Sequence, residues 1–333
     1  MQIRVIQVGL GPIGLAIAQQ LVGRRGFALV GAVDVDPAKI GLDVGELVGA
    51  GRRLRVKVTS SLTKTIRAVK PDVAVVATGS TLAGVLPTIE EILRQRVPVV
   101  TTTEEAAYPT PRTRRLAAAL DEAAQQARVA VLGTGVNPGF VMDALPIALT
   151  AACERVDRIE VTRVQDASIR RLPFQKKIGA GLSLREFQRR VDAGEVRHVG
   201  FAESMRMIAD AMGWRIERMT DDVRPRVAEA AVSSDVLAVA PGQVAGIEQR
   251  GTAYVGGEPR ITLRLEAYIG APHSYDADVI EGVPRISSRI ECGVHGDIAT
   301  ASTAVNAIPA IIVAPPGLRT MRDLRLPSFY GGR

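Results

Sequence analysis

Apolar runs alternate with segments of helical period over roughly the first 135 residues of the chain. The runs predict six strands, at residues 3–8, 28–34, 55–58, 72–78, 97–102 and 128–132. The segments between them predict helices at residues 12–23, 61–68, 83–95 and 111–126. The runs DVAVVAT (72–78) and VPVVTTT (97–103) are apolar on both faces, which is typical of central parallel strands. This alternation predicts an α/β domain with a doubly wound parallel sheet over residues 1–140.

The pattern changes after about residue 140. Residues 158–168 alternate like a half-exposed strand, and residues 253–270 predict a hairpin that turns at Gly256-Gly257. A helix is expected at about 201–213, whereas residues 168–181 show no clear period and predict a loop. These elements indicate a second α+β domain with a mixed or antiparallel sheet over residues 141–296.

A long apolar segment, residues 297–317, predicts a helix near the end of the chain. Asp297 is the expected N-cap of this helix, and Pro309 is expected to kink it. Residues 297–333 are predicted to return to the first domain and pack on it.

Three closely spaced glycines follow the first predicted strand. Gly9, Gly11 and Gly14 form G-x-G-x-x-G, with Pro12 and Ile13 between the last two. The first glycine permits a tight turn, the second lets the backbone approach a pyrophosphate, and the third lets the helix pack on the strand. The helix start also offers unpaired N–H groups and a positive dipole end. The motif predicts a Rossmann-type dinucleotide site; a glycine turn that serves packing alone is the alternative.

Asp34 ends the second predicted strand, twenty positions after Gly14. An acid at this place bonds to the hydroxyls of the adenosine ribose in dinucleotide-binding units. It also repels a 2′-phosphate, because two like charges at ~4 Å cost about 4 kcal/mol at an effective dielectric constant near 20. We therefore expect NAD(H) as the preferred cofactor, with NADP(H) accepted if Arg52 or Arg53 approaches. Asp36 is the structural alternative, a turn residue that touches no cofactor.

Composition and charge narrow the classes of partner. The chain has 333 residues with 42 Lys and Arg against 35 Asp and Glu, a net charge of +7. The arginines are scattered and often adjoin acids, so no nucleic-acid partner is expected. No apolar run is long enough to cross a bilayer and no signal peptide precedes the first strand, so we expect a cytoplasmic protein without a membrane partner. Cys153 and Cys292 fit neither a disulfide framework nor a metal-ligand spacing, and no metal is expected.

Polar residues that follow the parallel strands are candidates for the site, because ligands of such sheets bind beyond the carboxyl ends of the strands. The segment Thr78, Gly79 and Ser80 follows the fourth strand. Glu104 and Glu105 follow the fifth, where a nicotinamide ring would lie. Successive residues of an extended chain face opposite sides, so one glutamate is expected to enter the site. The structural alternative is an N-cap beside a solvated acid at a helix start.

Further candidates lie later in the chain. Asn137, in the turn GTGVNPGF, has an amide able to orient a small polar substrate or the nicotinamide carboxamide; a purely structural turn is the alternative. Arg163 and Gln165 share one face of a predicted strand in the second domain. His295 is one of three histidines, and a lone histidine is more often structural than catalytic.

Six motifs together resemble one protein family. They are VGLGPIG, AVDVDPAKIG-x-D-x-GEL, TTTEE, GTGVNPGFVMDALP, RVQDAS and HGDIATA-x-x-x-VNAIP-x-x-x-x-APPGL. In this combination the chain resembles the 2,4-diaminopentanoate dehydrogenase family, which includes the native amine dehydrogenases and is a branch of the dihydrodipicolinate reductase-like proteins. The resemblance covers nearly the whole chain.

The resemblance implies NAD(P)-dependent oxidative deamination of an amine to a ketone and ammonia, reversible as reductive amination. The amine is either 2,4-diaminopentanoate-like or a simple aliphatic amine. The resemblance also implies that the catalytic residue is Glu104, with Glu105 as second choice, and that the protein is a homodimer.

The family's second domain closes over the substrate, which implies that Arg163, Gln165 and residues 168–181 lie near it. If the substrate carries a carboxylate, Arg170, Arg171 or Lys176 is expected to bind it by charge. Asn137 and His295 complete the set of expected substrate residues.

Two other functions are weighed against this one. A dihydrodipicolinate reductase-like imine reductase would carry a His-His pair with a Lys and a Ser-Gly-Thr turn, and RVQDAS-x-x-RLPFQKK occupies the corresponding stretch. A non-catalytic dinucleotide-binding regulator would have no use for a glutamate beside the nicotinamide, because a buried carboxylate costs several kcal/mol without a partner.

Overall fold

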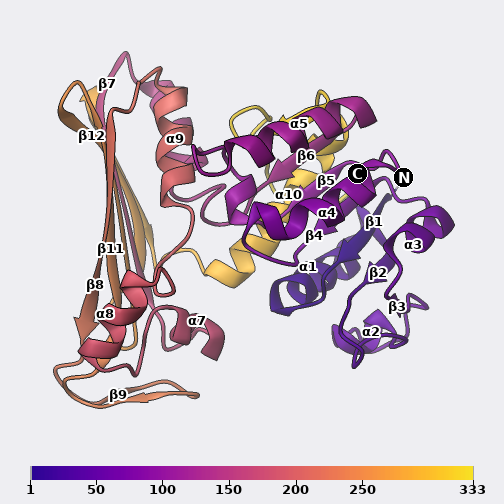
Figure 1. Cartoon of the computed structure of the whole chain (residues 1–333), viewed down its shortest axis with the longest axis horizontal. Coiled ribbons are helices and arrows are strands. Elements are labelled where there is room, and N and C mark those ends of the chain that lie inside the picture. The colour runs from indigo at the N-terminus through magenta and orange to yellow at the C-terminus, as the bar shows by residue number, and fades with distance from the viewer. Residues whose placement is uncertain (1, 333) are drawn as a thin grey trace. The chain divides into compact units, whose positions relative to one another are not determined.

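The computed structural model describes residues 2–332, which form two compact units. Unit 1 comprises the chain up to Phe140 together with the chain from His295 onward, and unit 2 comprises Val141–Val294. Figure 1 shows the elements of both units along the chain. Among residues 2–332, no helix is long and apolar enough to span a membrane.

Unit 1 contains a seven-stranded sheet in the order β15-β6-β5-β4-β1-β2-β3, and all neighbouring strands are parallel. The strands are β1 (Ile3–Val8), β2 (Phe27–Val33), β3 (Val58–Thr59), β4 (Val73–Val76), β5 (Val99–Thr101), β6 (Ala130–Gly133) and β15 (Gly317–Arg319). The predicted doubly wound sheet is confirmed. Sequence analysis missed β15, because three residues after two prolines carry no periodic signal.

Two groups of helices accompany this sheet. The helices of unit 1 are α1 (Pro12–Gly23), α2 (Val44–Leu47), α3 (Leu62–Val69), α4 (Leu82–Leu93), α5 (Arg114–Ala127) and α10 (Gly296–Ile312), with a 3₁₀ helix η1 (Glu104–Ala106). Helix α1 packs beside α10, whereas α3, α4 and α5 pack beside one another. The strand order runs outward from β1 in both directions, so right-handed crossovers place the two groups on opposite faces.

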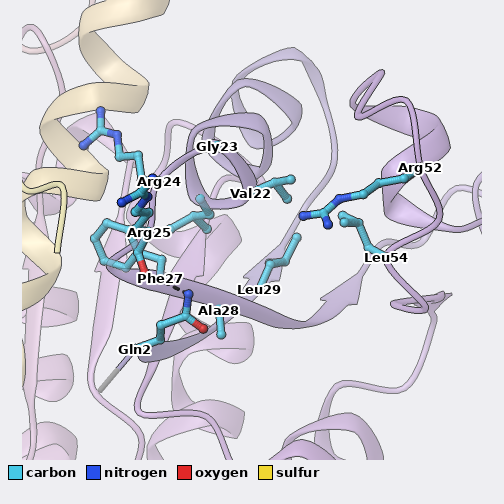
Figure 2. Close-up of a pocket in the computed structure, with 11 residues that line it drawn as sticks. Gln2, Val22, Gly23, Arg24, Arg25, Phe27, Ala28, Leu29, Arg52 and Leu54 are labelled. Atoms are coloured by element: carbon cyan, nitrogen blue, oxygen red, sulfur yellow. Dashed lines mark hydrogen bonds between the residues drawn. The ribbon is translucent and has the colours of Figure 1, made fainter.

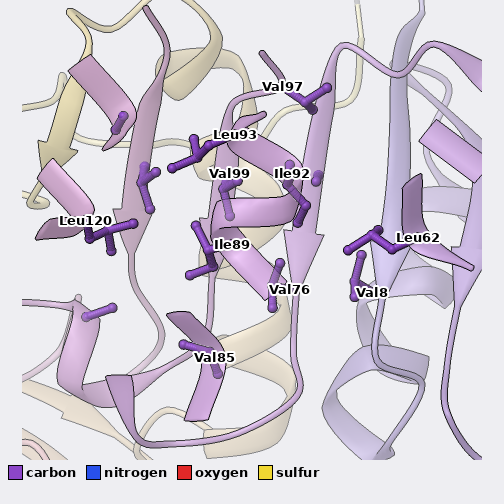
Figure 3. Close-up of a cluster of buried hydrophobic side chains, with 14 of the residues drawn as sticks. Val8, Leu62, Val76, Val85, Ile89, Ile92, Leu93, Val97, Val99 and Leu120 are labelled. Atoms are coloured by element: carbon purple, nitrogen blue, oxygen red, sulfur yellow. The ribbon is translucent and has the colours of Figure 1, made fainter. Parts of the chain in front are cut away.

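Buried aliphatic side chains fill the space between this sheet and the group that contains α4 and α5. Figure 3 shows Ile89 and Leu93 of α4 packed with Val76 and Val99 of the sheet and with Leu120 of α5. Each of these side chains is at most 2% exposed. This core fixes the positions of the strand ends from which the candidate site is built.

Two expectations for the C-terminal helix were wrong. The N-cap of α10 is His295, whose Nδ1 accepts a hydrogen bond from the Ile298 N–H (3.5 Å), and Asp297 lies in the first turn instead. The helix ends at Ile312, not at residue 317, since two consecutive prolines at 315 and 316 cannot continue it.

Unit 2 contains a six-stranded mixed sheet in the order β14-β13-β7-β12-β11-β8, as predicted. Strand β12 is parallel to β7, and the other neighbouring pairs are antiparallel. The strands are β7 (Arg155–Asp166), β8 (Arg218–Val227), β11 (Val244–Val255), β12 (Glu258–Tyr268), β13 (Tyr275–Val283) and β14 (Ile286–Glu291); β9 (Val232–Ser233) and β10 (Ala238–Val239) pair separately. The hairpin turns at Gly256 and Gly257, whose φ angles of +61° and +78° favour glycine.

The helices of unit 2 are α6 (Ala144–Leu149), α7 (Leu172–Lys177), α8 (Leu184–Asp192) and α9 (Phe201–Ala211), with a 3₁₀ helix η2 (Thr150–Ala152). Helix α9 packs on β11 and β12, where a Cβ at Gly251 would lie 2.8 Å from the Phe201 ring. Helix α7 corrects the loop expected at residues 168–181. Pro173 stands in its first turn and two lysines in its last, but six residues are too few to show a helical period.

Candidate active site

The glycine turn joins β1 to α1 and leaves open space where a pyrophosphate would approach. Gly9 has φ +84°, and a Cβ there would lie 2.6 Å from the Ala77 carbonyl oxygen. A Cβ on Gly14 would lie 1.9 Å from the Gly9 carbonyl oxygen, so this glycine is required for the packing of α1 on β1. Gly11, the N-cap of α1, has no atom within 4 Å of its ideal Cβ position, and Pro12 and Ile13 follow it. Packing therefore explains Gly9 and Gly14 but not Gly11.

Asp34 follows β2 and is tied into this turn. Its Oδ2 accepts a hydrogen bond from the Leu10 N–H (2.5 Å), and its Oδ1 accepts one from the Asp36 N–H (2.8 Å). The cation beside it is Lys39, whose Nζ lies 3.8 Å from Asp34 Oδ2 and 3.1 Å from Asp36 Oδ2. Sequence analysis pointed to Arg52 and Arg53 for this place and missed Lys39.

Arg52 and Arg53 lie elsewhere. Arg53 pairs with Glu46 (3.2 Å), and Arg52 lines a cavity of about 330 Å³ beside the C-terminal end of α1 and the start of β2. Figure 2 shows the Arg52 guanidinium directed toward Val22 and Leu29 in this cavity. Because α1 runs antiparallel to the strands, the cavity lies at the opposite end of α1 from the glycine turn.

Residues 78–80, after β4, contact both the glycine turn and the acidic segment. Thr78 Cγ2 would lie 2.8 Å from a Cβ on Gly9. The Gly79 carbonyl accepts a hydrogen bond from Thr103 Oγ1 (2.9 Å), and the Ser80 carbonyl accepts one from the Glu105 N–H (3.3 Å). The carboxyl ends of β1, β4 and β5 therefore meet at one edge of the sheet.

The two glutamates of η1 differ in what they contact. Glu105 is 6% exposed; its Oε2 accepts a hydrogen bond from the Leu82 N–H (2.8 Å) at the start of α4, and its Oε1 accepts one from Arg112. Glu104, one residue earlier, is half-buried. Glu105 thus caps α4 and pairs with Arg112, which matches the structural alternative for one member of the doublet.

Asn137 lies in the turn after β6 and is 6% exposed. The peptide bond to Pro138 is cis, and Gly139 has φ +128° with the Gly135 N–H group 2.5 Å from its ideal Cβ position. Thr300 of α10 supports the turn, because its Oγ1 accepts a hydrogen bond from the Val136 N–H (3.4 Å).

Arg163, Gln165 and Arg170, three of the candidate substrate residues, lie together in unit 2. Arg163 Nε lies 3.2 Å from Asp276 Oδ1, and both side chains are at most 3% exposed. Arg170 donates to Gln165 Oε1 (3.0 Å) and stacks at 4.1 Å on the Phe174 ring. The cluster is thus internally paired, and sequence analysis missed Asp276.

Lys176 and His295 lie on other elements of the chain. Lys176 is exposed at the end of α7, and His295 belongs to unit 1, where it caps α10.

Burial controls the ionisation of the cluster. Burial lowers the pKa of Arg163 to about 10 in spite of the opposing charge of Asp276. Burial raises the pKa of Asp276, and it raises the pKa of Asp278 to about 6 against the hydrogen bond from Ser288 Oγ (3.1 Å). Asp276 Oδ1 and Asp278 Oδ1 are buried without a hydrogen-bond partner.

This chain is similar to known proteins over nearly its whole length. The family model described as the 2,4-diaminopentanoate dehydrogenase C-terminal domain matches residues 140–332. The 2,4-diaminopentanoate dehydrogenase of Acetoanaerobium sticklandii is 34% identical over 338 residues, covering 99% of this chain and 96% of that protein. The chain belongs to the 2,4-diaminopentanoate dehydrogenase family.

Two further relatives carry amine dehydrogenase names. An amine dehydrogenase of Streptomyces virginiae is 24% identical and covers 97% of this chain and 96% of its own length. The structure of an amine dehydrogenase from Mycobacterium smegmatis superposes with a TM-score of 0.88 at 25% identity, covering 100% of this chain and 99% of the other. The similarity to these two amine dehydrogenases therefore covers both units.

This member of the 2,4-diaminopentanoate dehydrogenase family shows no grouping of three or more His, Cys, Asp or Glu side chains that would hold a metal within residues 2–332. The residues that fit a bound cofactor are those of the glycine turn and Asp34, because the open space at Gly11 suits a dinucleotide.

The sequence did contain a signal for Asp276, which sequence analysis missed. In YDADVI, two acids and an isoleucine occupy every second position and therefore share one face of the strand.

Proposed function

We propose that this protein is a nicotinamide-dependent amine dehydrogenase. It interconverts an amine and water with a ketone and ammonia, and NAD(H) is the preferred cofactor. Family membership supports the reaction class, and the open backbone at Gly11 supports the dinucleotide. The chemistry that a bound nicotinamide supplies is acceptance of a hydride from the amine carbon.

The glycine turn would hold the pyrophosphate at the start of α1. Its residues are Gly9, Gly11, Pro12, Ile13 and Gly14. Asp34 would bind the ribose hydroxyls. Its carboxylate accepts hydrogen bonds from the Leu10 and Asp36 N–H groups, which leaves acceptor positions for hydroxyl donors. Lys39 lowers the cost of a 2′-phosphate near Asp34, so NADP(H) is the second cofactor. Thr78, Gly79 and Ser80 border the same edge.

Glu104 is the proposed base. The observation that supports this assignment is that Glu104 follows β5 and is half-buried, whereas Glu105 is buried and bonds to the Leu82 N–H and to Arg112. Glu104 takes a proton from the substrate ammonium and passes it to solvent. After hydride transfer it takes a proton from the water that adds to the substrate carbon and returns this proton to the nitrogen. The nitrogen then leaves as ammonia, and the oxygen of the water becomes the ketone oxygen. Asn137 would orient the polar end of the substrate.

Arg163 and Gln165 are weaker candidates for direct contact with substrate than the sequence indicated. The charge of Arg163 is already paired with Asp276, and Arg170 already donates to Gln165. A carboxylated substrate would therefore need Lys176 or a rearranged Arg170. We propose on this ground that simple aliphatic amines are accepted alongside diamino acids.

We also propose a homodimer formed through the sheet of unit 2. On the sheet face opposite α9, Arg226 and Arg264 pair with Glu248 and Glu266, and Glu266 is only 8% exposed in its side chain. Light scattering coupled to size-exclusion chromatography tests the dimer, and a monomeric mass would contradict it.

The decisive experiment for function is a substrate panel. Reduced cofactor, ammonium and either plain aliphatic or carboxylated ketones are mixed with the protein while the absorbance of NADH is followed. Ammonia-dependent loss of NADH supports the proposal. Turnover of a cyclic imine in the absence of ammonium would identify an imine reductase instead, and NADH binding without any turnover would identify a regulator.

A further inference from the structure

The cavity that Arg52 lines lies within unit 1 and apart from the dinucleotide site. It is bordered by the C-terminal end of α1, by the start of β2 and by the side chains of Arg52 and Leu54. Helix α1 has 12 residues, so at 1.5 Å per residue the cavity lies about 18 Å along this helix from the glycine turn. We call this space the α1–β2 cavity.

The α1–β2 cavity is open because strand β3 is short. Strand β2 pairs with β1 from Phe27 onward, whereas β3 pairs with β2 only at Ala32 and Val33. Among residues 2–332, no strand therefore covers the other side of β2 at residues 27–30. The volume of about 330 Å³ is within the range of small-molecule sites.

Apolar side chains form a firm wall for this cavity. Leu21 is fully buried and Phe27 is 3% exposed, so the core of unit 1 holds both in place. Val22, Leu29 and Leu54 are half-buried and complete the wall. Such a surface gains free energy when a hydrocarbon chain displaces water from it.

Three arginines line the same cavity, and their charges are not neutralised by the protein. The Arg24 guanidinium donates to the amide oxygens of two neutral side chains. The side chains of Arg25 and Arg52 have no carboxylate partner among residues 2–332, whereas Arg53, the next residue, pairs with Glu46 (3.2 Å). In Figure 2 the Arg52 guanidinium reaches over the apolar wall. The cavity therefore combines an apolar surface with cations that are open to an anion.

We propose that the α1–β2 cavity binds a small aliphatic carboxylate. Arg52 would bind the carboxylate directly, and the charge of Arg25 would add long-range attraction. The hydrocarbon chain would lie on Val22, Leu29 and Leu54. At about 30 Å³ for each water-sized group, the cavity takes roughly ten non-hydrogen atoms, which is the size of octanoate. The inference does not rest on the proposed function, because binding is measured without turnover.

Isothermal titration of the full protein with sodium octanoate, in the presence of saturating NADH, tests the site. We expect one saturable site with a dissociation constant of about 1 mM or below. Arg52→Met, which keeps an apolar stem and removes the charge, should weaken binding about tenfold. Arg25→Met should weaken it about two- to threefold. The matched control is Arg53→Met, which should leave the affinity within about twofold because Arg53 already pairs with Glu46.

Two ligands of related structure test the chemical class. Octanol has the same chain without the charge, and inorganic phosphate has charge without the chain, so both should bind at least about tenfold more weakly than octanoate. Equal affinity for octanol would show an apolar groove that does not select an anion, and equal affinity for phosphate would show an anion site that does not use the apolar wall. Either result overturns the proposal.

Hydrogen exchange followed by mass spectrometry locates the bound octanoate. We expect slower exchange in residues 20–30, with residues 9–14 and the dissociation constant of NADH unchanged. Displacement of NADH, unchanged affinity in Arg52→Met, or an equal loss of affinity in Arg53→Met overturns the proposal. If octanoate binds as expected but the protein aminates no ketone, the proposed function fails and the α1–β2 site stands.

Discussion

The carboxyl edge of the sheet in unit 1 and the buried pair of Arg163 and Asp276 in unit 2 place polar side chains in different ways. At the edge, Asp34 and Glu104 follow strand ends, where loops leave room for ligands; Glu104 is half-buried and Asp34 is 9% exposed. In unit 2, Arg163 and Asp276 sit within strands and are buried almost completely. A polar group inside a sheet must find its partner on the neighbouring strand, whereas one at a strand end is able to serve a ligand. Burial alone therefore does not mark a catalytic residue in this molecule.

The largest expected effect concerns the two adjacent glutamates. Glu104→Ala is expected to lower kcat by about 10²–10⁴-fold, the usual contribution of a general base. The dissociation constant of NADH, measured by fluorescence titration, should stay within twofold. Glu105→Ala should instead lower the unfolding temperature, because it leaves Arg112 and the Leu82 N–H without their partner. Full turnover in Glu104→Ala would move the base to another residue.

The glycine turn provides a second contrast, within one motif. Gly11→Ala meets no neighbouring atom in the protein, so the fold should keep its unfolding temperature while NADH binds about tenfold more weakly, since the new methyl group occupies the pyrophosphate approach. Gly14→Ala should destabilise the fold, because its Cβ would lie 1.9 Å from the Gly9 carbonyl oxygen. Equal NADH affinity in Gly11→Ala and the parent protein would show that the turn serves packing alone.

Cofactor preference should respond to the charges around Asp34. Asp34→Ala is expected to raise the ratio of NADP(H) to NAD(H) efficiency about tenfold, because the carboxylate repels the 2′-phosphate. Lys39→Ala is expected to lower this ratio severalfold, because the Lys39 ammonium, 3.8 Å from Asp34, offsets part of that repulsion. The ratio of kcat/KM for the two cofactors is the measurement. Arg53→Ala is the control, since Arg53 pairs with Glu46. A shift in the control as large as that in Lys39→Ala would contradict this assignment.

The last effect is a pH-dependent change in stability that arises in unit 2. Burial raises the pKa of Asp278 to about 6, above its value of about 4 in the unfolded chain. Between these values the folded protein holds a proton that the unfolded chain has lost, so the free energy of unfolding falls as the pH rises, by about 3 kcal/mol at most. Asp278→Asn should therefore be more stable than the parent protein by about 2 kcal/mol at pH 8 and equal to it near pH 4. Urea titrations at both values test this, and a pH-independent difference would refute it.

Much of unit 1 was predictable because its signals are local. Strand runs, the glycine spacing and Asp34 at the end of β2 all follow from residues close together in sequence, and the parallel sheet is confirmed. Lys39 escaped prediction because only the folded turn brings its ammonium to Asp34.

The interior of unit 2 was harder to predict for a physical reason. Partners such as Arg163 and Asp276 lie more than a hundred residues apart and meet only through the register of β7 with β13. Helix α7 was missed because six residues carry no periodic pattern. The choice of His295 over Asp297 as N-cap depends on one backbone conformation, which the spacing of polar residues does not fix.

The position of β15 at the end of the chain has a consequence for biosynthesis. This strand extends the parallel sheet beside β6, yet almost two hundred residues separate the two, and all of unit 2 is encoded between them. A ribosome therefore releases the whole of unit 2 before it releases the residues that complete unit 1. During that interval the outer edge of β6 and the surface later covered by α10 are exposed to solvent. A nascent chain truncated before residue 296 should therefore bind chaperones that the finished protein does not bind.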